Sequence, residues 1–194
     1  IIESKSFKLY LNSLNQMRYE SVYDVQAILE KDLSNAAKAD VTVIIRDVDS
    51  ISSLVVLTPD YCIDELDINV TDYHPNADLL VVKSKSNIVE ERLVSHLLKS
   101  NCPVTNQPDW GSVFIDYKGP QIDHESLLKY VISFREHTDF HEQCVERIFI
   151  DIMRHCRPEH LTIYARYVRR GGLDINPYRS SMPVVLGNDR LTRQ

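Results

Sequence analysis

The sequence predicts an α+β fold in which antiparallel sheets carry paired helices on one face. Three observations support this prediction: apolar stripes with helical spacing, β-branched runs that flank turn residues, and an internal repeat. The chain has 194 residues, of which 43% are hydrophobic and 26% charged, as in ordinary globular proteins. This length allows one large core or two modest domains.

The repeat becomes visible when the sequence is shifted against itself by 120 positions. A stretch of about 45 positions then contains eight identical pairs without a gap, against about two or three expected by chance. We therefore expect one module in two copies. The identical pairs are Ile2 with Ile122, Ser6 with Ser126, Tyr10 with Tyr130, Ser13 with Ser133, Val25 with Val145, Ile28 with Ile148, Thr42 with Thr162 and Arg46 with Arg166.

In the first copy, segment 3–10 predicts the start of a helix, and Ser21 with Asp24 resembles the capping box of a second helix. β-Branched runs at 41–46 and 54–57 flank a polar turn and predict a hairpin. The second helix would bury an apolar face made of Val22, Val25, Ile28, Leu29 and Leu33.

The second copy repeats this order and adds two strands before it, at 91–99 and 112–118. It ends in a predicted hairpin of 161–170 and 174–178 around two glycines. The helix between these parts would face the core through Val145, Ile148, Phe149, Ile152, Met153 and Cys156.

We therefore expect an N-terminal module over residues 1–85, which lacks its first strands, and a C-terminal module over residues 86–194. The stretch 72–85 contains Pro75, has no clear period and is expected to link the two modules. Because the sequence opens without Met and at once enters a patterned segment, we expect it to start inside a longer protein.

The charge balance argues against a broad nucleic-acid surface, since 22 basic residues face 28 acidic ones and the net charge is -6. No apolar run reaches the roughly 18 residues of a bilayer helix, and the first residues do not form a signal peptide. The chain is therefore expected to be cytoplasmic. Its four cysteines are then better explained as reduced thiols than as disulfides.

A loop between the two added strands holds a thiol, Cys102, and a carboxyl group, Asp109. Asn101, Pro103 and Pro108 mark this segment as a loop, where functional groups often lie. Cys102 could be a nucleophile and Asp109 a proton donor, with the neighbouring Trp110 as an apolar wall. A core-filling thiol and a turn-capping carboxylate are the alternatives.

A second motif, His141 and Glu142, lies at the start of the second helix of the C-terminal copy. These residues could simply cap the helix. They could also bind a guanine-like ring, with Glu142 accepting paired N–H hydrogen bonds and His141 donating one. A third possibility is a zinc site made of Cys102, His141 and Cys144.

Cationic groups form the remaining motifs. Strand alternation predicts that Arg166, Val168 and Arg170 share one face, either as a phosphate clamp or as a solvated edge strand. Ser4 and Lys5 at a helix start also suit phosphate, although an exposed first turn is equally compatible with them.

Taken together, the motifs resemble the QueF family, the NADPH-dependent 7-cyano-7-deazaguanine reductases of queuosine biosynthesis. The resemblance implies tandem tunnelling-fold modules, a cytoplasmic homodimer and a role in tRNA modification that acts on the free base, without a nucleic-acid or membrane partner. The segments that carry it are Glu-Ser-Lys-Ser-Phe-Lys-Leu-Tyr at 3–10, Ser-Asn-Cys and Gln-Pro-Asp-Trp within 100–110, Phe-His-Glu-Gln-Cys at 140–144, and Arg-Arg-Gly-Gly-Leu-Asp-Ile-Asn-Pro at 169–177.

The resemblance also implies the roles of individual residues. Cys102 would form a covalent thioimide with the nitrile of 7-cyano-7-deazaguanine, Asp109 would donate a proton, and NADPH would deliver two hydrides to give the 7-aminomethyl product. No metal is implied. Substrate contacts would come from Ile2, Glu3, Ser4, His141 and Glu142, and cofactor contacts from Ser4, Lys5, Arg170 and Gly171.

Two other functions stay open at the level of sequence. One is a zinc-dependent, GTP cyclohydrolase-like hydrolase of pterins or purines on the same fold. The other is a purine-binding module that has lost turnover.

Overall fold

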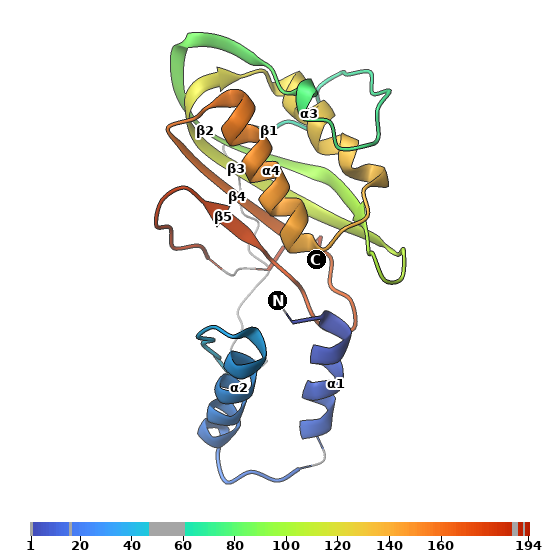
Figure 1. Ribbon diagram of the computed structural model, residues 1–194, viewed down its shortest axis with the longest axis vertical. Coiled ribbons are helices and arrows are strands. Elements are labelled where there is room, and N and C mark those ends of the chain that lie inside the picture. Colours follow the sequence, from blue (N-terminus) through green and yellow to red (C-terminus); the bar gives the residue numbers. More distant parts are fainter. Residues whose placement is uncertain (1, 16, 47–60, 188–189, 192) are drawn as a thin grey trace. The chain divides into compact units, whose positions relative to one another are not determined.

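The computed structural model describes residues 2–15, 17–46, 61–187, 190–191 and 193–194 (Figure 1). Its internal contacts divide the chain into two units, each of which is treated by itself. The N-terminal unit contains residues 1–53 together with 171–173, and the C-terminal unit contains residues 54–170 and 174–194.

The N-terminal unit contains two helices, α1 (Ser4–Leu14) and α2 (Val22–Ala37). The carboxylate of Glu3 caps α1, and the hydroxyl of Ser21 caps α2 by accepting the Asp24 backbone N–H, as the capping box predicts. α1 buries no residue and α2 buries only Leu29. Of the predicted apolar face of α2, Leu29 is buried, two residues are half-buried and two are exposed: Val25 and Leu33, and Val22 and Ile28.

The predicted strand at 41–46 is not a strand in the structure. Two of its backbone N–H groups donate to side chains of α2 instead: Val41 to the Ser34 hydroxyl and Val43 to the Glu30 carboxylate. β-Branched residues favour a strand only where a neighbouring strand pairs with them, and no such partner is described for this segment. The second predicted strand, 54–57, lies outside the described residues.

The C-terminal unit is built on a five-stranded sheet of order β1-β2-β3-β4-β5 (Figure 1). β1 runs parallel to β2, and the remaining neighbouring strands are all antiparallel to each other. The strands are β1 (Tyr61–Cys62), β2 (Val82–Asn101), β3 (Pro108–Ile122), β4 (His160–Tyr167) and β5 (Tyr178–Ser180), and two short 3-10 helices are η2 (Ala77–Leu79) and η3 (Ser133–Glu136).

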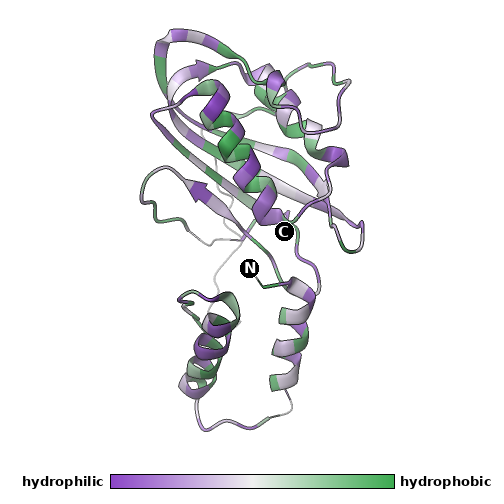
Figure 2. Ribbon diagram, in the orientation of Figure 1, coloured by the Kyte–Doolittle hydropathy of each residue, from purple (hydrophilic) through white to green (hydrophobic). Residues whose placement is uncertain are grey.

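Helices α3 (His124–Ile132) and α4 (His141–Cys156) pack on this sheet, α3 mainly against β2 and α4 against β4 (Figure 1). α4 has the predicted apolar stripe, and apolar positions alternate with polar ones along it (Figure 2). The stripe packs against alternate residues of β3, including Val113, Ile115 and Tyr117, which are at most 1% exposed. The α+β class with a helix pair on an antiparallel sheet is confirmed. Among the described ranges, no helix is both long and apolar enough to cross a bilayer.

The helix pairs of the two units correspond to the sequence repeat. Shifted by 120 positions, the start of α1 at Ser4 falls on the start of α3 at His124, and the start of α2 at Val22 falls one residue after the start of α4. Each second helix ends at a residue in the left-handed conformation, Lys38 or Arg157.

Several boundaries differ from the expected ones. The contacts divide the chain near residue 53 rather than at 85, because β1 pairs with β2 and Ile63 is fully buried in the core of the C-terminal unit. The expected linker 72–85 contains η2 and the start of β2. The strand expected at 174–178 is β5, which begins only at Tyr178.

Candidate active site around Cys102

The Cys102 segment is the loop of the β2–β3 hairpin. Asn101 pairs with Pro108 at the end of the ladder, and Ser100 pairs with Asp109. The Cys102 carbonyl accepts the backbone N–H of Asn106 at 2.8 Å, and the Cys102 N–H donates to the Gln107 carbonyl at 2.9 Å. Asn106 has φ +54°, a left-handed conformation that Asn tolerates better than most residues. The loop therefore closes on itself and holds the thiol at a fixed place.

The Cys102 thiol is surrounded by hydrogen-bond donors. Partial burial alone would raise its pKa, but the Thr105 hydroxyl, the backbone N–H groups of Thr105 and Val104, and the Arg170 guanidinium all donate to sulfur. These donors stabilise the thiolate and lower the pKa of Cys102 to about 7. A large fraction of the thiol is then a nucleophilic thiolate at neutral pH.

Asp109 lies inside the sheet rather than at an exposed turn and is only 5% exposed. Its Oδ1 atom is 2.7 Å from Arg170 Nη2, and its Oδ2 atom is 3.2 Å from His141 Nε2. The structure therefore brings two other predicted site residues, Arg170 and His141, to the carboxyl group of Asp109.

His141 is fixed from two sides. Its ring stacks on the ring of Tyr167, with centroids 4.0 Å apart and planes at 20°. The backbone just before α4 is tied to the Cys102 hairpin, because Asn101 donates its N–H to the His137 carbonyl at 2.8 Å and accepts the Asp139 N–H at 3.1 Å. The start of α4 and the nucleophile loop are thus held together by main-chain hydrogen bonds. Glu142 follows in the first turn of α4 and is half-buried.

Arg170 has a more central position than the sequence suggested. It donates to Cys102, it contacts Asp109, and its Nη1 donates to the Gln107 side-chain oxygen at 2.7 Å. The expectation that Arg170 shares a face with Arg166 is wrong. β4 ends at Tyr167, so the strict alternation of a strand does not extend to Arg170.

Trp110 does not supply the apolar wall expected beside Asp109. Neighbouring residues of a strand point to opposite faces, and Trp110 is 45% exposed on the face that carries Ser112 and Arg166. The aromatic surface near Asp109 is the His141–Tyr167 stack instead.

The remaining predicted contacts belong to the N-terminal unit: Ile2, Glu3, Ser4, Lys5 and Gly171. The Glu3 carboxylate accepts the backbone N–H groups of Lys5 and Ser6, both at 2.8 Å, and these hydrogen bonds lower the pKa of Glu3. Lys5 is exposed in the first turn of α1, and Gly171 is exposed with φ +59°.

In the part of the chain that the structure describes, Cys102, His141 and Cys144 do not form a group whose ligand atoms are close enough to hold a metal. Among the described residues, the group of His, Cys and acidic side chains close enough to hold a metal is Cys62, Asp64 and His96, with ligand atoms within 4.8 Å of one another. Cys144 is buried beside the hydroxyls of Ser100 and Tyr167, and burial raises its pKa to about 11. Cys156 is 2% exposed in the core, as its place on the apolar stripe predicts.

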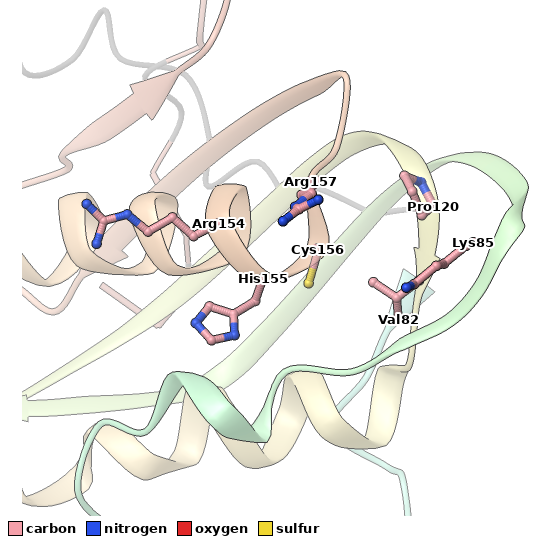
Figure 3. A pocket seen from close by; sticks show the side chains of 7 residues that line it. All are labelled: Val82, Lys85, Pro120, Arg154, His155, Cys156 and Arg157. Atoms are coloured by element: carbon pink, nitrogen blue, oxygen red, sulfur yellow. The ribbon is translucent and has the colours of Figure 1, made fainter.

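A cavity of about 460 Å³ lies at the far end of α4, away from Cys102 (Figure 3). Its basic groups, Lys85, Arg154, His155 and Arg157, are exposed, and Cys156 lies beneath them. None of the residues around Cys102 lines this cavity.

The sequence did not reveal three contributors to the site: Thr105, Gln107 and Tyr167. Thr105 and Gln107 are polar residues of a loop, and only the closure of that loop turns them toward sulfur and Arg170. Tyr167 looks like one more aromatic residue of a strand. Only the position of Thr105, three residues after Cys102 in a predicted loop, could have indicated its role. In turns, N–H groups and hydroxyls two or three residues further along often form hydrogen bonds back to an earlier residue.

The comparisons with known proteins give matches at both ends of the chain. Residues 1–45 match the family model described as "Nitrile reductase, 7-cyano-7-deazaguanine-reductase N-term", and residues 108–183 match the one described as "QueF-like protein". A similar solved structure, described as "Crystal structure of the archaeosine synthase QueF-Like in the apo form", is 19% identical and covers 50% of this chain and 96% of its own, with a TM-score of 0.44. Since the two family models follow each other in order and together match more than half of the sequence, the chain belongs to the QueF family.

Proposed function

We propose that this protein reduces the nitrile of 7-cyano-7-deazaguanine to the 7-aminomethyl group, with NADPH as reductant and a covalent thioimide on Cys102 as intermediate. The observation that carries the proposal is the Cys102 thiol, whose pKa of about 7 is set by donors of its own loop and by Arg170. Membership of a nitrile reductase family supports the same conclusion.

In this proposal the Cys102 thiolate adds to the nitrile carbon. One carbon–nitrogen π bond breaks as the carbon–sulfur bond forms. The nitrile nitrogen takes a proton from the Asp109–His141 pair, in which Oδ2 of the carboxyl group lies 3.2 Å from Nε2 of the imidazole. Arg170 holds the nucleophile and the acid in register, because it contacts both of them. Covalent addition replaces one hard reduction by easier steps, since a protonated thioimide accepts hydride more readily than a nitrile.

NADPH, when bound, supplies two hydrides, and each is matched by one proton. Breaking the carbon–sulfur bond after the first reduction returns the Cys102 thiolate, and the same loop donors that activated it stabilise it as a leaving group. The burial of Asp109 and His141 keeps bulk water away from the proton source.

We assign cofactor contacts to Ser4, Lys5, Arg170 and Gly171, and substrate contacts to Ile2, Glu3, Ser4, His141 and Glu142. Within the N-terminal unit, Glu3 already occupies the first free backbone N–H groups of α1. A cofactor phosphate would therefore interact with the Lys5 ammonium and the Ser4 hydroxyl rather than with the helix N-terminus itself. Gly171 is exposed, and the cationic and hydroxyl groups present fit the phosphates of the cofactor. A cytoplasmic homodimer remains part of the proposal.

Intact-protein mass spectrometry tests the proposed intermediate. Mixing the protein with the nitrile in the absence of NADPH should add the mass of one substrate molecule, and the Cys102→Ala variant should add none. Cys62→Ala is the matched control, because it removes an exposed thiol away from the site and should leave the adduct intact. An adduct that persists in Cys102→Ala would disprove the assignment. Binding of the nitrile with no adduct and no NADPH consumption would favour the purine-binding module.

A further inference from the structure

Arg166 is a buried cation with unused hydrogen-bonding capacity. The residue is 1% exposed, and it lies in β4 on the opposite side of the sheet from the Asp109–His141 pair. Its Nε donates to the Gln194 side chain at 2.9 Å, and its guanidinium carbon lies 5.4 Å from the centre of the Tyr164 ring. Its two terminal nitrogens, Nη1 and Nη2, are buried and have no hydrogen-bond partner among the described residues.

These nitrogens carry four N–H donors, and leaving a desolvated charged donor unpaired is unfavourable. Folded proteins normally pair such groups, and because the described residues supply no acceptor, a bound ligand can take that place. The cation–π contact with Tyr164 offsets only part of this cost, since it leaves the N–H donors in the ring plane of the guanidinium without acceptors.

Arg166 is also one of the residues that line a cavity of about 210 Å³. This volume is below that of typical sites for drug-sized molecules and suits a small ion or a single charged group. Further cationic or donor groups line it as well: Arg193, which is exposed, His96 and Ser112, whose Oγ lies 2.7 Å from His96 Nδ1. The remaining lining residues are Trp110, Gly111 and Val168.

We propose that this cavity is a binding site for a phosphate-type oxyanion, either free phosphate or the phosphate group of a larger ligand. Two arginines line this cavity, and a guanidinium group presents paired N–H donors in a plane, which matches the several oxygens of phosphate. Among the residues that the structure describes, no carboxylate lines the cavity. Asp64 lies near one edge, where its Oδ2 accepts the backbone N–H of His96 at 2.8 Å.

The site is separate from the one proposed for nitrile reduction. Arg166, Ser112 and Trp110 face one side of the sheet, and Asp109 and Tyr167 face the other with His141. Variants of the oxyanion site can therefore be examined by binding alone, whatever the outcome for Cys102.

Trp110 provides a local probe, because it lines the cavity and is the single tryptophan of the sequence. We expect titration of the full chain with inorganic phosphate, at constant ionic strength, to change its fluorescence with a dissociation constant of about 1 mM or lower. Arg166→Met should abolish the saturable change, and Arg193→Gln should weaken binding by roughly tenfold. Arg154→Gln removes an exposed arginine of the other basic cavity and should leave the constant unchanged.

The absence of saturation at roughly 20 mM phosphate would overturn the proposal. An equal loss of binding in Arg154→Gln would also overturn it, because bulk charge would then explain the signal. If circular dichroism shows that the Arg166→Met variant does not fold, the test rests on Arg193→Gln, because Arg193 is exposed. Unchanged phosphate binding in Arg193→Gln would then refute the site. Adenosine 5'-monophosphate distinguishes the two ligand sources: equal affinity indicates the free ion, and affinity at least about tenfold higher indicates the phosphate of a nucleotide.

Discussion

At the residue scale, Cys102 depends on its neighbours in the chain more than on distant charges. Its first hydrogen-bond donors are the hydroxyl and backbone N–H of Thr105 and the N–H of Val104, and Arg170 adds a donor from β4's continuation. Successive backbone N–H groups that converge on one atom form a site for negative charge. A loop of six residues therefore builds most of the environment of the thiolate.

Removing the Thr105 hydroxyl should make Cys102 less acidic. Because only the thiolate is alkylated, iodoacetamide labelling of Cys102 should be half-maximal near pH 7 and fall as pH drops through that value. In Thr105→Val the midpoint should rise by about one pH unit, which corresponds to about 1.4 kcal/mol. Peptide mapping identifies the labelled thiol, and Cys102→Ala gives the background. An unchanged midpoint would show that the hydroxyl does not contact sulfur.

Asp109→Asn should separate proton donation from activation of the nucleophile. The amide keeps the size of the side chain but has no proton to give, so nitrile turnover should fall by about 10²- to 10⁴-fold. Alkylation of Cys102 at high pH should stay within a few-fold of the wild-type rate, because the loop donors around sulfur remain. A parallel loss of both rates would indicate collapse of the site rather than loss of an acid.

At the element scale, the patterns within one helix were reliable, whereas the strand predictions were correct only in part. The cap at Ser21 and the apolar stripe of α4 were predicted correctly, because both depend on residues one to four positions apart. The strand at 41–46 was wrong, since a strand is defined by pairing that the sequence does not show. The strands at 91–99 and 112–118 were placed correctly but are longer, as β2 and β3 extend to the closed loop.

The end of α4 offers a matched pair of substitutions with opposite effects. Arg157 has φ +50°, where glycine is less strained, so Arg157→Gly should raise the free energy of unfolding by about 0.5–1 kcal/mol. Arg154 is helical and exposed, and Arg154→Gly should lower it by about the same amount. Both variants lose one positive charge from the last turn of the helix, so the charge effect is similar. Urea denaturation followed by circular dichroism measures both, and two shifts of the same sign would contradict the argument.

At the scale of the whole molecule, the sequence repeat predicted the corresponding helix pairs. It did not predict that the helices of the two units bury very different numbers of apolar residues. α3 and α4 bury most of their apolar residues on a sheet, whereas α1 and α2 bury only Leu29. The residues of the candidate site were identified by motif, yet their arrangement was not. That Arg170 joins Cys102 to Asp109 depends on how the chain turns after β4, which no local pattern encodes.

Amide hydrogen exchange should show this difference between the units. Helices with few buried side chains open at low cost, so amides of α1 and α2 should exchange at least about 100-fold faster than those of α4. The core residues Ile148 and Ile152 of α4 are fully buried and should be among the slowest. Mass spectrometry of peptides from the exchanged protein gives the comparison. Equal protection in both units would mean that α1 and α2 are covered by something the intramolecular contacts do not include.

The closed hairpin at Cys102 also limits which insertions the chain can tolerate. Asp109 faces His141 only because β3 is paired in one register, with Asp109 opposite Ser100. One residue added between Pro103 and Pro108, if the ladder took it up, would turn Trp110 toward α4 and Asp109 toward solvent. A change of two residues would restore the face but move the carboxyl group by about 7 Å along the strand. Length variation among natural relatives should therefore be rare in this loop and common in connections that carry no such constraint.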